Sequence, residues 1–427
     1  MSTRFTVVIP TRERCDTLEW TLKTCVMQDY DNLEILVSDN NSADRTEEVA
    51  RSFDDPRIRY INTGSSLSMT DNFEFALSHV TGGFVTCIGD DDGLLPNACV
   101  GLNEVITVHR CRALTWQKPD YFWSTLIDPN RANTLSIALP RHDAITVMDS
   151  SVMLRKVSEF KLLYPNLPTV YHGCIEYTIV QDIIRRSGRF FHSSIPDAYS
   201  AIAVTCTLNA YHHSTKPYSI MGLSGHSVGG GYLNLSKHSA EDTSNKSAQW
   251  LNDNSIPFHR ELVMFPSLPI ITAEAFFQVR DHLGCEDKPS INIKKLIRAA
   301  INEKSLLLDP EKYVNLTRTI EAIAAIHGVE DYARKLITKH RYRSVLTLIR
   351  TALGVIFENR VSLDAAGMGI DNIYDASLYC EHISKLYKPL YIKCAVYLGN
   401  YIKKGEMVWR SGARMVMSPE VCRKRRH

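Results

Sequence analysis

The N-terminal part of the chain alternates short apolar runs with segments of helical periodicity. The apolar runs have the length and β-branched content that are typical of buried parallel strands. They cover Phe5–Ile9, Leu33–Val37, Ile58–Ile61 and Phe84–Ile88. Between the first two runs, Leu18, Leu22, Cys25 and Val26 recur at the spacing of one helix face. Strands that alternate with helices predict a parallel sheet with right-handed crossovers, and therefore an α/β fold.

Polar residues follow three of these predicted strands. They are Pro10, Thr11, Arg12 and Glu13 after the first strand, Asp39, Asn40 and Asn41 after the second, and Asp90, Asp91 and Asp92 after the fourth. The carboxyl ends of parallel strands share one edge of the sheet, where open α/β sheets bind ligands, so we expect these residues to converge. The three adjacent carboxylates, the acidic triplet, repel one another unless a hard cation such as Mg²⁺ or Mn²⁺ lies among them. A solvated acidic turn is the alternative interpretation.

The rest of the chain is expected to become mainly helical. Helices are predicted at about 97–108, 150–160 and 174–186, and a strand at 190–195 that ends at Pro196-Asp197. We expect two domains, residues 1–235 with nucleotide-sugar-binding and catalytic roles and residues 236–427 as a mainly helical region. The glycine-rich segment Ser224–Gly231 suits a lid over substrate and a linker equally well.

Composition narrows the class of protein. The 427 residues are 44% hydrophobic and 22% charged, as in an ordinary globular protein, and 49 Lys and Arg against 47 Asp and Glu give no signal for nucleic acid. The 11 cysteines include no Cys-x-x-Cys pair, which indicates reduced thiols. Met1–Arg4 leads directly into a strand and no apolar run approaches ~20 residues, so a cytoplasmic protein is expected.

The C-terminal tail is basic. It ends in Cys422–His427, and Lys403, Lys404, Arg410 and Arg414 precede it. A frayed, solvated terminus is one interpretation. Contact with an anionic membrane surface, which would place the protein peripherally at the inner membrane face, is the other.

Motif spacing disfavours two nucleotide-binding classes. No Gly-x-Gly-x-x-Gly follows the first strand, and no Gly-x-x-x-x-Gly-Lys-Ser/Thr occurs. The predicted sheet edge instead suits a nucleotide whose diphosphate is bridged to the protein by a metal ion. Asp39 would accept a hydrogen bond from a base N–H or a ribose hydroxyl, although Asp is also favoured at strand ends for turn formation.

Three segments carry a family resemblance. Phe5–Arg14, Gln28–Thr46 and Gly89–Asp92 resemble, in order and spacing, the family 2 glycosyltransferases with the GT-A fold. The resemblance is close over about residues 4–110. It implies a Rossmann-like, mostly parallel sheet with flanking helices, followed here by the mainly helical region. It also implies metal-dependent transfer, with Mn²⁺ or Mg²⁺, of a sugar from a nucleoside diphosphate donor, expected to be UDP-linked, to an acceptor hydroxyl with inversion. A sugar or lipid-linked acceptor in bacterial polysaccharide or glycoconjugate synthesis is expected.

The resemblance also implies roles for individual residues. Nucleotide contacts fall on Pro10, Thr11, Arg12, Glu13, Asp39, Asn41, Asn72, Asp90 and Asp91, and metal contacts on Asp91 and Asp92, with the register of the triplet open. At Asn72 the basic residue that often precedes it in the family is replaced by Asp71, so this phosphate contact departs from the pattern. His226 is a further candidate for a metal or phosphate contact.

The resemblance gives less guidance on the catalytic base. Family members place the base in a Glu-Asp pair at a helix start, and the corresponding residues here are Glu176 and Tyr177. An inverting transferase needs a carboxylate to take the proton of the acceptor hydroxyl. Glu176 is therefore the first candidate, and Asp182 and Asp197 are the fallbacks.

Two other functions stay open at the level of sequence. The altered Glu176-Tyr177 pair is compatible with a non-catalytic nucleotide-binding or scaffold protein. A sugar-nucleotide nucleotidyltransferase would need a first loop rich in glycine and lysine to hold a triphosphate. The loop Pro10–Glu13 lacks both residue types, which disfavours that function.

Overall fold

The computed structural model of the protein describes residues 2–126, 128–138, 143–227, 255–285, 288–304, 310–340, 360–384, 407–410 and 414–417. The predicted domain boundary at residue 235, the glycine-rich segment after Ser227 and the basic tail Cys422–His427 lie outside these residues.

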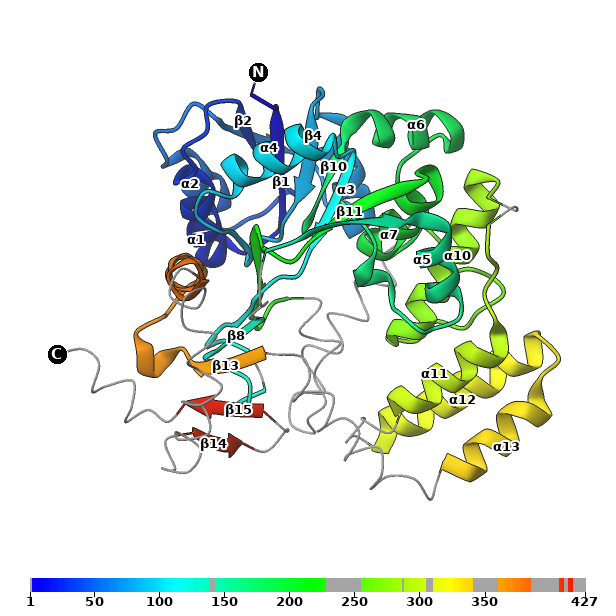
Figure 1. Ribbon diagram of the computed structural model, residues 1–427. Coiled ribbons are helices and arrows are strands. Elements are labelled where there is room, and N and C mark those ends of the chain that lie inside the picture. Colours follow the sequence, from blue (N-terminus) through cyan, green and yellow to red (C-terminus); the bar gives the residue numbers. More distant parts are fainter. Residues whose placement is uncertain are drawn as a thin grey trace.

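A large mixed sheet forms the N-terminal half of the molecule (Figure 1). Its strand order is β3-β2-β1-β4-β10-β6-β11-β9, with β1 to β4 all parallel and β10 antiparallel to both of its neighbours. The strands are β1 (Phe5–Thr11), β2 (Leu33–Asp39), β3 (Ile58–Asn62), β4 (Phe84–Cys87), β6 (Ala113–Trp116), β9 (Ile145–Asp149), β10 (Gly173–Glu176) and β11 (Ala210–Ser214). The four N-terminal strands predicted from apolar periodicity are thus confirmed, and so is the α/β class.

Helices cover both faces of this sheet. Because side chains alternate along a strand, Val7 and Ile9 of β1 pack into one core with α1 and α4, whereas Val8 packs into the other core with α3 and α7. These helices are α1 (Cys15–Val26), α2 (Thr46–Arg51), α3 (Met69–Ser78), α4 (Ala98–His109), α5 (Ser150–Ser158), α6 (Tyr177–Ser187) and α7 (Pro196–Thr207). Ser68 caps α3 by accepting a hydrogen bond from the Asp71 N–H at 3.1 Å.

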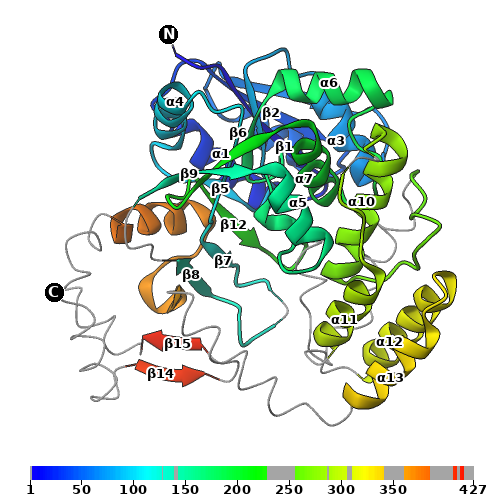
Figure 2. The same cartoon turned by 45° about the vertical axis from the view of Figure 1, so that its right-hand side comes forward.

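A second sheet lies beside the C-terminal edge of the first (Figure 2). Its order is β14-β15-β13-β8-β7-β12-β5. The strands are β5 (Gly93–Leu94), β7 (Asp120–Phe122), β8 (Thr134–Ala138), β12 (Ser219–Leu223), β13 (Arg360–Asp364), β14 (Met407–Arg410) and β15 (Arg414–Met417). The chain passes from the large sheet into the second sheet three times, from β4 to β5, from β6 to β7 and from β11 to β12. The acidic triplet forms the first of these crossings.

The C-terminal region adds helices, as predicted. They are α10 (Leu268–Leu283), α11 (Ile293–Lys304), α12 (Pro310–Ile326) and α13 (Glu330–His340). Helix α10 packs against α7, and its apolar side chains belong to the same core as those of α3, α6 and α7. None of the helices in the described part of the chain combines the length and hydropathy that a membrane span requires.

Two segments differ from the prediction. Gly173–Glu176 is strand β10 between β4 and β6, so α6 begins at Tyr177 and not near Cys174. The expected strand at 190–195 is a loop. The N–H groups of Phe190 and Phe191 donate to the Glu74 carboxylate at 2.8 Å each, while both rings are buried in the core. The Glu74 side chain thus accepts the hydrogen bonds that a neighbouring strand would otherwise accept from these N–H groups. The chain then enters α7 at Pro196.

Candidate functional site

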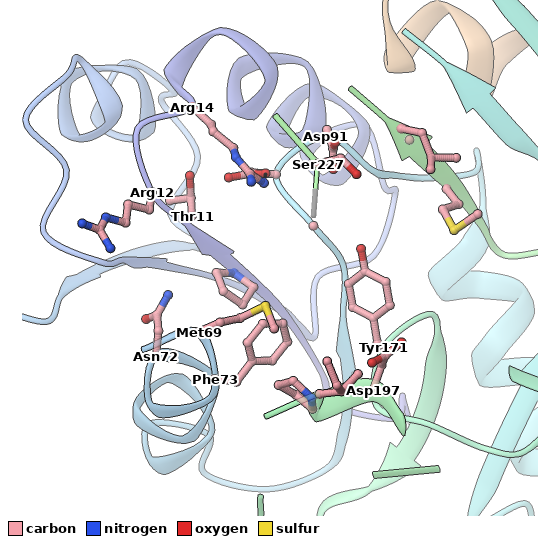
Figure 3. A pocket seen from close by; sticks show the side chains of 18 of the residues that line it. Thr11, Arg12, Arg14, Met69, Asn72, Phe73, Asp91, Tyr171, Asp197 and Ser227 are labelled. Atoms are coloured by element: carbon pink, nitrogen blue, oxygen red, sulfur yellow. Dashed lines mark hydrogen bonds and ion pairs between the residues drawn. The ribbon is translucent and has the colours of Figure 1, made fainter. Parts of the chain in front are cut away.

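A cavity of about 410 Å³ lies at the C-terminal edge of β1 and β4. Figure 3 shows the side chains that line it. They come from the β1 loop, the start of α3, the acidic triplet, the end of β12, and the first turns of α7 and α10. The predicted convergence of strand-end residues at this edge therefore holds for Pro10, Thr11, Arg12, Asn72, Asp90 and Asp91, all of which line the cavity.

Asp90 and Asp91 face the cavity with different partners. Arg14 Nη1 donates to Asp90 Oδ1 at 2.9 Å, while Asp90 Oδ2 is buried without a hydrogen-bond partner. The Ser224 hydroxyl donates to Asp91 Oδ2 at 2.7 Å, and the Ser224 N–H donates to the same oxygen at 3.1 Å. Burial, together with the negative charges of the other two carboxylates, raises the pKa of Asp91 to about 7. A positive charge brought close to Asp91 would therefore favour its ionised form.

Asp92 has a structural environment and does not line the cavity. Its Oδ2 accepts hydrogen bonds from the Gly89 N–H at 2.6 Å and the Tyr171 hydroxyl at 2.5 Å, and lies 2.9 Å from His172 Nε2. Its Oδ1 accepts from the Gly222 N–H at 2.7 Å. Despite burial, the His172 and Tyr171 contacts lower the pKa of Asp92. The expectation that Asp92 binds metal is corrected by this placement, because its oxygens are occupied by protein donors.

Arg14 is a functional candidate that the sequence reasoning missed. Its guanidinium is mostly buried, pairs with Asp90 and donates to the backbone carbonyl of His226. Burial alone would lower the pKa of Arg14, but Asp90 and Asp91 raise it, so the group stays charged. His226, expected to contribute its side chain, contributes its carbonyl oxygen to this contact. The signal for Arg14 was present in the quoted first loop, as a basic residue facing an acidic triplet.

The other predicted nucleotide contacts divide into two groups. Asp39 is buried and does not line the cavity. It accepts from the Tyr60 hydroxyl at 2.6 Å and from the Ser42 N–H at 3.0 Å. Glu13 and Asn41 also lie outside the lining, and Glu13 accepts from the Ala43 N–H at 2.7 Å, which joins the β1 loop to the β2 loop. Asp39 and Glu13 thus support the β1 and β2 loops, whose residues Arg12 and Asn40 line the cavity.

Glu176 is not brought to the cavity. It pairs with Phe84, the first residue of β4, whereas the acidic triplet follows the other end of that strand. Its carboxylate accepts from Arg112 Nε at 2.6 Å at the protein surface. The expectation that Glu176 is the catalytic base is corrected by the geometry, since β10 runs antiparallel to β4 and carries Glu176 to the opposite edge of the sheet.

Asp197, a fallback in the sequence reasoning, lines the cavity at the first turn of α7. In Figure 3 its side chain and that of Asp91 lie on either side of the Tyr171 ring. The Tyr164 hydroxyl donates to Asp197 Oδ2 at 2.8 Å. Burial raises the pKa of Asp197, and the Tyr164 hydrogen bond opposes that shift. A partly buried carboxylate with a raised pKa is a stronger base than a free aspartate, which suits it to accept a proton.

The carboxylate oxygens of Asp90 and Asp91 suit a divalent cation whose remaining ligands come from a bound substrate. Within the described ranges, no group of three or more His, Cys, Asp or Glu side chains forms a metal site by itself. Asp90 Oδ2 is a buried oxygen without a partner, and Asp91 lies beside it. Mg²⁺ is commonly bound by one or two carboxylates completed by substrate phosphates and water. Asp90 and Asp91 satisfy that pattern, whereas Asp92 does not.

Comparison with known sequences defines the class of this domain. Residues 6–174 match the sequence model of glycosyl transferase family 2. The part of the chain that is similar to this family contains β1 to β4, the β1 loop and the acidic triplet. The GT-A fold class, with its mostly parallel sheet and flanking helices, is thereby confirmed.

Individual relatives are similar over differing spans. A 98-residue segment is 39% identical to the GalNAc(5)-diNAcBac-PP-undecaprenol beta-1,3-glucosyltransferase of Campylobacter jejuni, covering 22% of this chain and 32% of that protein. The match thus spans about a third of the relative. Among solved structures, S. aureus TarS 1-349 in complex with UDP-GlcNAc is 14% identical, with a TM-score of 0.43 over 79% of this chain and 91% of that chain. The mannosyltransferase PcManGT of Pyrobaculum calidifontis is 17% identical, with a TM-score of 0.35 over 81% of this chain and 88% of that chain.

Proposed function

We propose that the protein is an inverting glycosyltransferase that moves a sugar from a nucleoside diphosphate donor, expected to be UDP-linked, to an acceptor hydroxyl. The observation that carries this proposal is the arrangement of one cavity, in which Arg14, Asp90 and Asp91 lie at one end and the partly buried carboxylate Asp197 lies across Tyr171 from them. The family of residues 6–174 supports it.

The reaction follows from these positions. The Asp197 carboxylate takes the proton of the acceptor hydroxyl, whose oxygen forms a bond to the anomeric carbon of the donor sugar. The bond from that carbon to the diphosphate oxygen breaks, and its electron pair leaves with the nucleoside diphosphate. A single base on the side opposite the leaving group gives inversion. Tyr164 positions Asp197 through its hydrogen bond.

The other end of the cavity holds the donor. Thr11, Arg12 and Asn72 line the part proposed for the nucleotide, and Arg14 supplies a fixed positive charge beside the departing diphosphate. Mg²⁺ or Mn²⁺ held by Asp91 and Asp90 would act there as a Lewis acid. In the absence of donor, Arg14 offsets part of the negative charge of the triplet.

The relative from C. jejuni suggests the biological setting. Its name specifies a lipid-linked oligosaccharide acceptor, and we propose a glycoconjugate acceptor for this chain as well. A cytoplasmic protein remains the expectation. Peripheral membrane contact through the basic tail stays a prediction, because that tail lies outside the described residues.

Calorimetric titration tests the donor end. UDP is expected to bind in the presence of Mn²⁺ more tightly than GDP, and Asp91→Asn is expected to remove the dependence on Mn²⁺ while leaving thermal unfolding near that of the wild type. Absence of binding by both nucleotides to a folded protein would overturn the donor site.

Asp197→Asn tests the base. It is expected to keep UDP affinity and to lower transfer, measured as UDP release from UDP-sugars, by roughly 10²–10⁴-fold. Asp182→Asn is the matched control, since Asp182 pairs with Arg185 on the surface of α6 and does not line the cavity. Equal activity of the two variants would place the base elsewhere. Retained UDP binding without transfer by the wild type, over a broad acceptor set, would favour a non-catalytic nucleotide-binding protein.

A further inference from the structure

The end of the cavity that contains Asp197 has an apolar wall to which both the N-terminal part of the chain and the C-terminal region contribute. Ile195 and Pro196 come from the start of α7, and Leu268 and Ile271 come from the first turn of α10. Phe73 of α3 lies near Asp197 in Figure 3. Since α7 and α10 pack against each other in one core, this wall is held by rigid elements. Leu268 is 37% exposed, so this part of the wall is accessible to a ligand.

One carboxylate stands in this wall. Glu303 of α11 lines the cavity, accepts the Ser267 hydroxyl and accepts the Leu268 N–H at 3.2 Å. It thereby fixes the first turn of α10. Burial raises the pKa of Glu303. A carboxylate at the edge of an apolar surface can accept a hydrogen bond from a ligand hydroxyl, but it disfavours a second negative charge nearby.

The distribution of charge along the cavity is one-sided. Its lining cations are Arg12 and Arg14, both in the β1 loop, and Arg14 is engaged with Asp90. Asp197 and Glu303 are the lining carboxylates from the α7 and α11 side. Lys118 acts on Asp197 electrostatically but does not line the cavity. An anionic sugar placed beside Asp197 would therefore lose hydration and contact no cation among these lining residues. A methyl group at the same place would gain contact with the apolar wall.

Resting on the proposed function, we infer that the sugar unit whose hydroxyl reaches Asp197 is uncharged and carries a methyl-bearing substituent, either an acetamido group or the methyl of a 6-deoxy sugar. The Leu268–Ile271 surface receives the methyl group. Glu303 is the residue that discriminates against acidic sugars. Its carboxylate accepts a hydroxyl of the neutral sugar and repels a uronate.

Saturation-transfer NMR in the presence of UDP and Mn²⁺ tests this inference without requiring turnover. The probes are the methyl glycosides of N-acetylglucosamine, N-acetylgalactosamine and fucose, with those of glucuronic and galacturonic acid. We expect transfer to the acetyl or 6-deoxy methyl protons of at least one neutral probe, and at least tenfold weaker binding of both uronates. Uronates that bind as well as the neutral probes, or neutral probes that show no methyl signal, would overturn the inference.

Two variants test which residues cause the preference for neutral sugars with a methyl group. Glu303→Gln preserves the shape of the side chain and is expected to strengthen uronate binding roughly tenfold while changing neutral binding less than threefold. Ile271→Ser is expected to reduce the methyl signal without admitting uronates. Glu159→Gln, which removes a half-exposed carboxylate that pairs with Lys161 and Lys295 and does not line the cavity, is the control for loss of charge alone. An unchanged ratio of uronate to neutral binding in Glu303→Gln would exclude Glu303 as the discriminating residue.

The same samples separate this inference from the proposed function. Signals of UDP itself report the donor site. If UDP binds and the uronates bind equally well, the acceptor inference alone fails. If UDP does not bind, the proposed function fails first.

Discussion

The three adjacent aspartates differ in what each side chain touches. Asp90 pairs with Arg14, Asp91 accepts hydrogen bonds from Ser224, and Asp92 is enclosed by donors from Gly89, Tyr171 and Gly222. The backbone turn after β4 points the first two toward the cavity and the third into the protein. Sequence reasoning located the triplet and its edge of the sheet, but identical residue types could not reveal which carboxylate is turned inward.

Glu176→Gln is expected to leave sugar transfer within about twofold of the wild type. Its carboxylate lies at the opposite end of β4 from the triplet and pairs with Arg112, whose side chain is 55% exposed. Exposed ion pairs contribute ~0–1 kcal/mol, so the free energy of unfolding should also change little. Steady-state UDP release and thermal unfolding measure both quantities. A loss of transfer with unchanged UDP affinity would return the role of base to Glu176.

Asp197, the carboxylate proposed as the base, was harder to predict from sequence than the cavity residues of the β1 loop and the triplet. The β1 loop and the triplet follow strands with clear apolar periodicity. Asp197 follows an apolar run, Phe190–Ile195, whose pattern is typical of a strand. The run is a loop because Glu74, more than a hundred residues earlier, takes its backbone N–H groups. The local sequence pattern carries no information about this long-range contact.

Among the elements, α7 and α10 decide how the C-terminal region packs against the N-terminal part of the chain. Their interface contains a buried carboxyl group, Glu274 of α10. Glu274 accepts the hydroxyl of Ser193, and it accepts from Gln278 Nε2 at 2.8 Å. Burial raises the pKa of Glu274 to about 7, against these two hydrogen bonds. Periodicity predicted helices in this region, but not which domain surface they would cover.

Stability is expected to depend on pH through Glu274. Its pKa is higher in the folded protein than in the unfolded chain, whose reference value is 4.5. The folded state therefore holds more protons between these values, and the free energy of unfolding falls as pH rises from about 4.5 to about 7. Glu274→Gln removes this contribution and should raise the melting temperature at pH 8 more than at pH 5. Chemical unfolding of the wild type and the variant between pH 5 and pH 8 measures this contribution. Equal changes in the free energy of unfolding at pH 5 and at pH 8 would exclude Glu274 as the cause.

At the scale of the whole molecule, the site exists where two sheets meet. The chain crosses between them at the triplet, and β12 returns so close that its Gly222 lies against the backbone of Asp91. A Cβ atom at Gly222 would be 1.7 Å from the Asp91 carbonyl oxygen. The sequence predicted the four parallel strands β1 to β4 of the first sheet but expected part of β10 as helix. It did not predict that a second sheet forms, because the strands of that sheet come from segments as distant as β5 and β13.

Gly222→Ala is therefore expected to force β12 away from the triplet. It should release the Gly222 N–H from Asp92 and the Ser224 donors from Asp91, and abolish UDP binding. Gly328→Ala is a control for backbone strain without a clash, because Gly328 has φ +64° and nothing within 4 Å of the added Cβ. That control should cost about 1 kcal/mol and retain the site. Calorimetry with UDP and thermal unfolding compare them, and normal UDP affinity in Gly222→Ala would contradict the close approach.

The enclosure of Asp92 has a consequence for how the triplet can change during evolution. Under the proposed function, selection on donor chemistry would act through Asp90 and Asp91, whereas selection on folding would act through Asp92 and the donors around it. A lineage that altered its donor could vary the first two positions and still keep the third. The three identical residues of the triplet thus have separate roles, which single mutations can change independently.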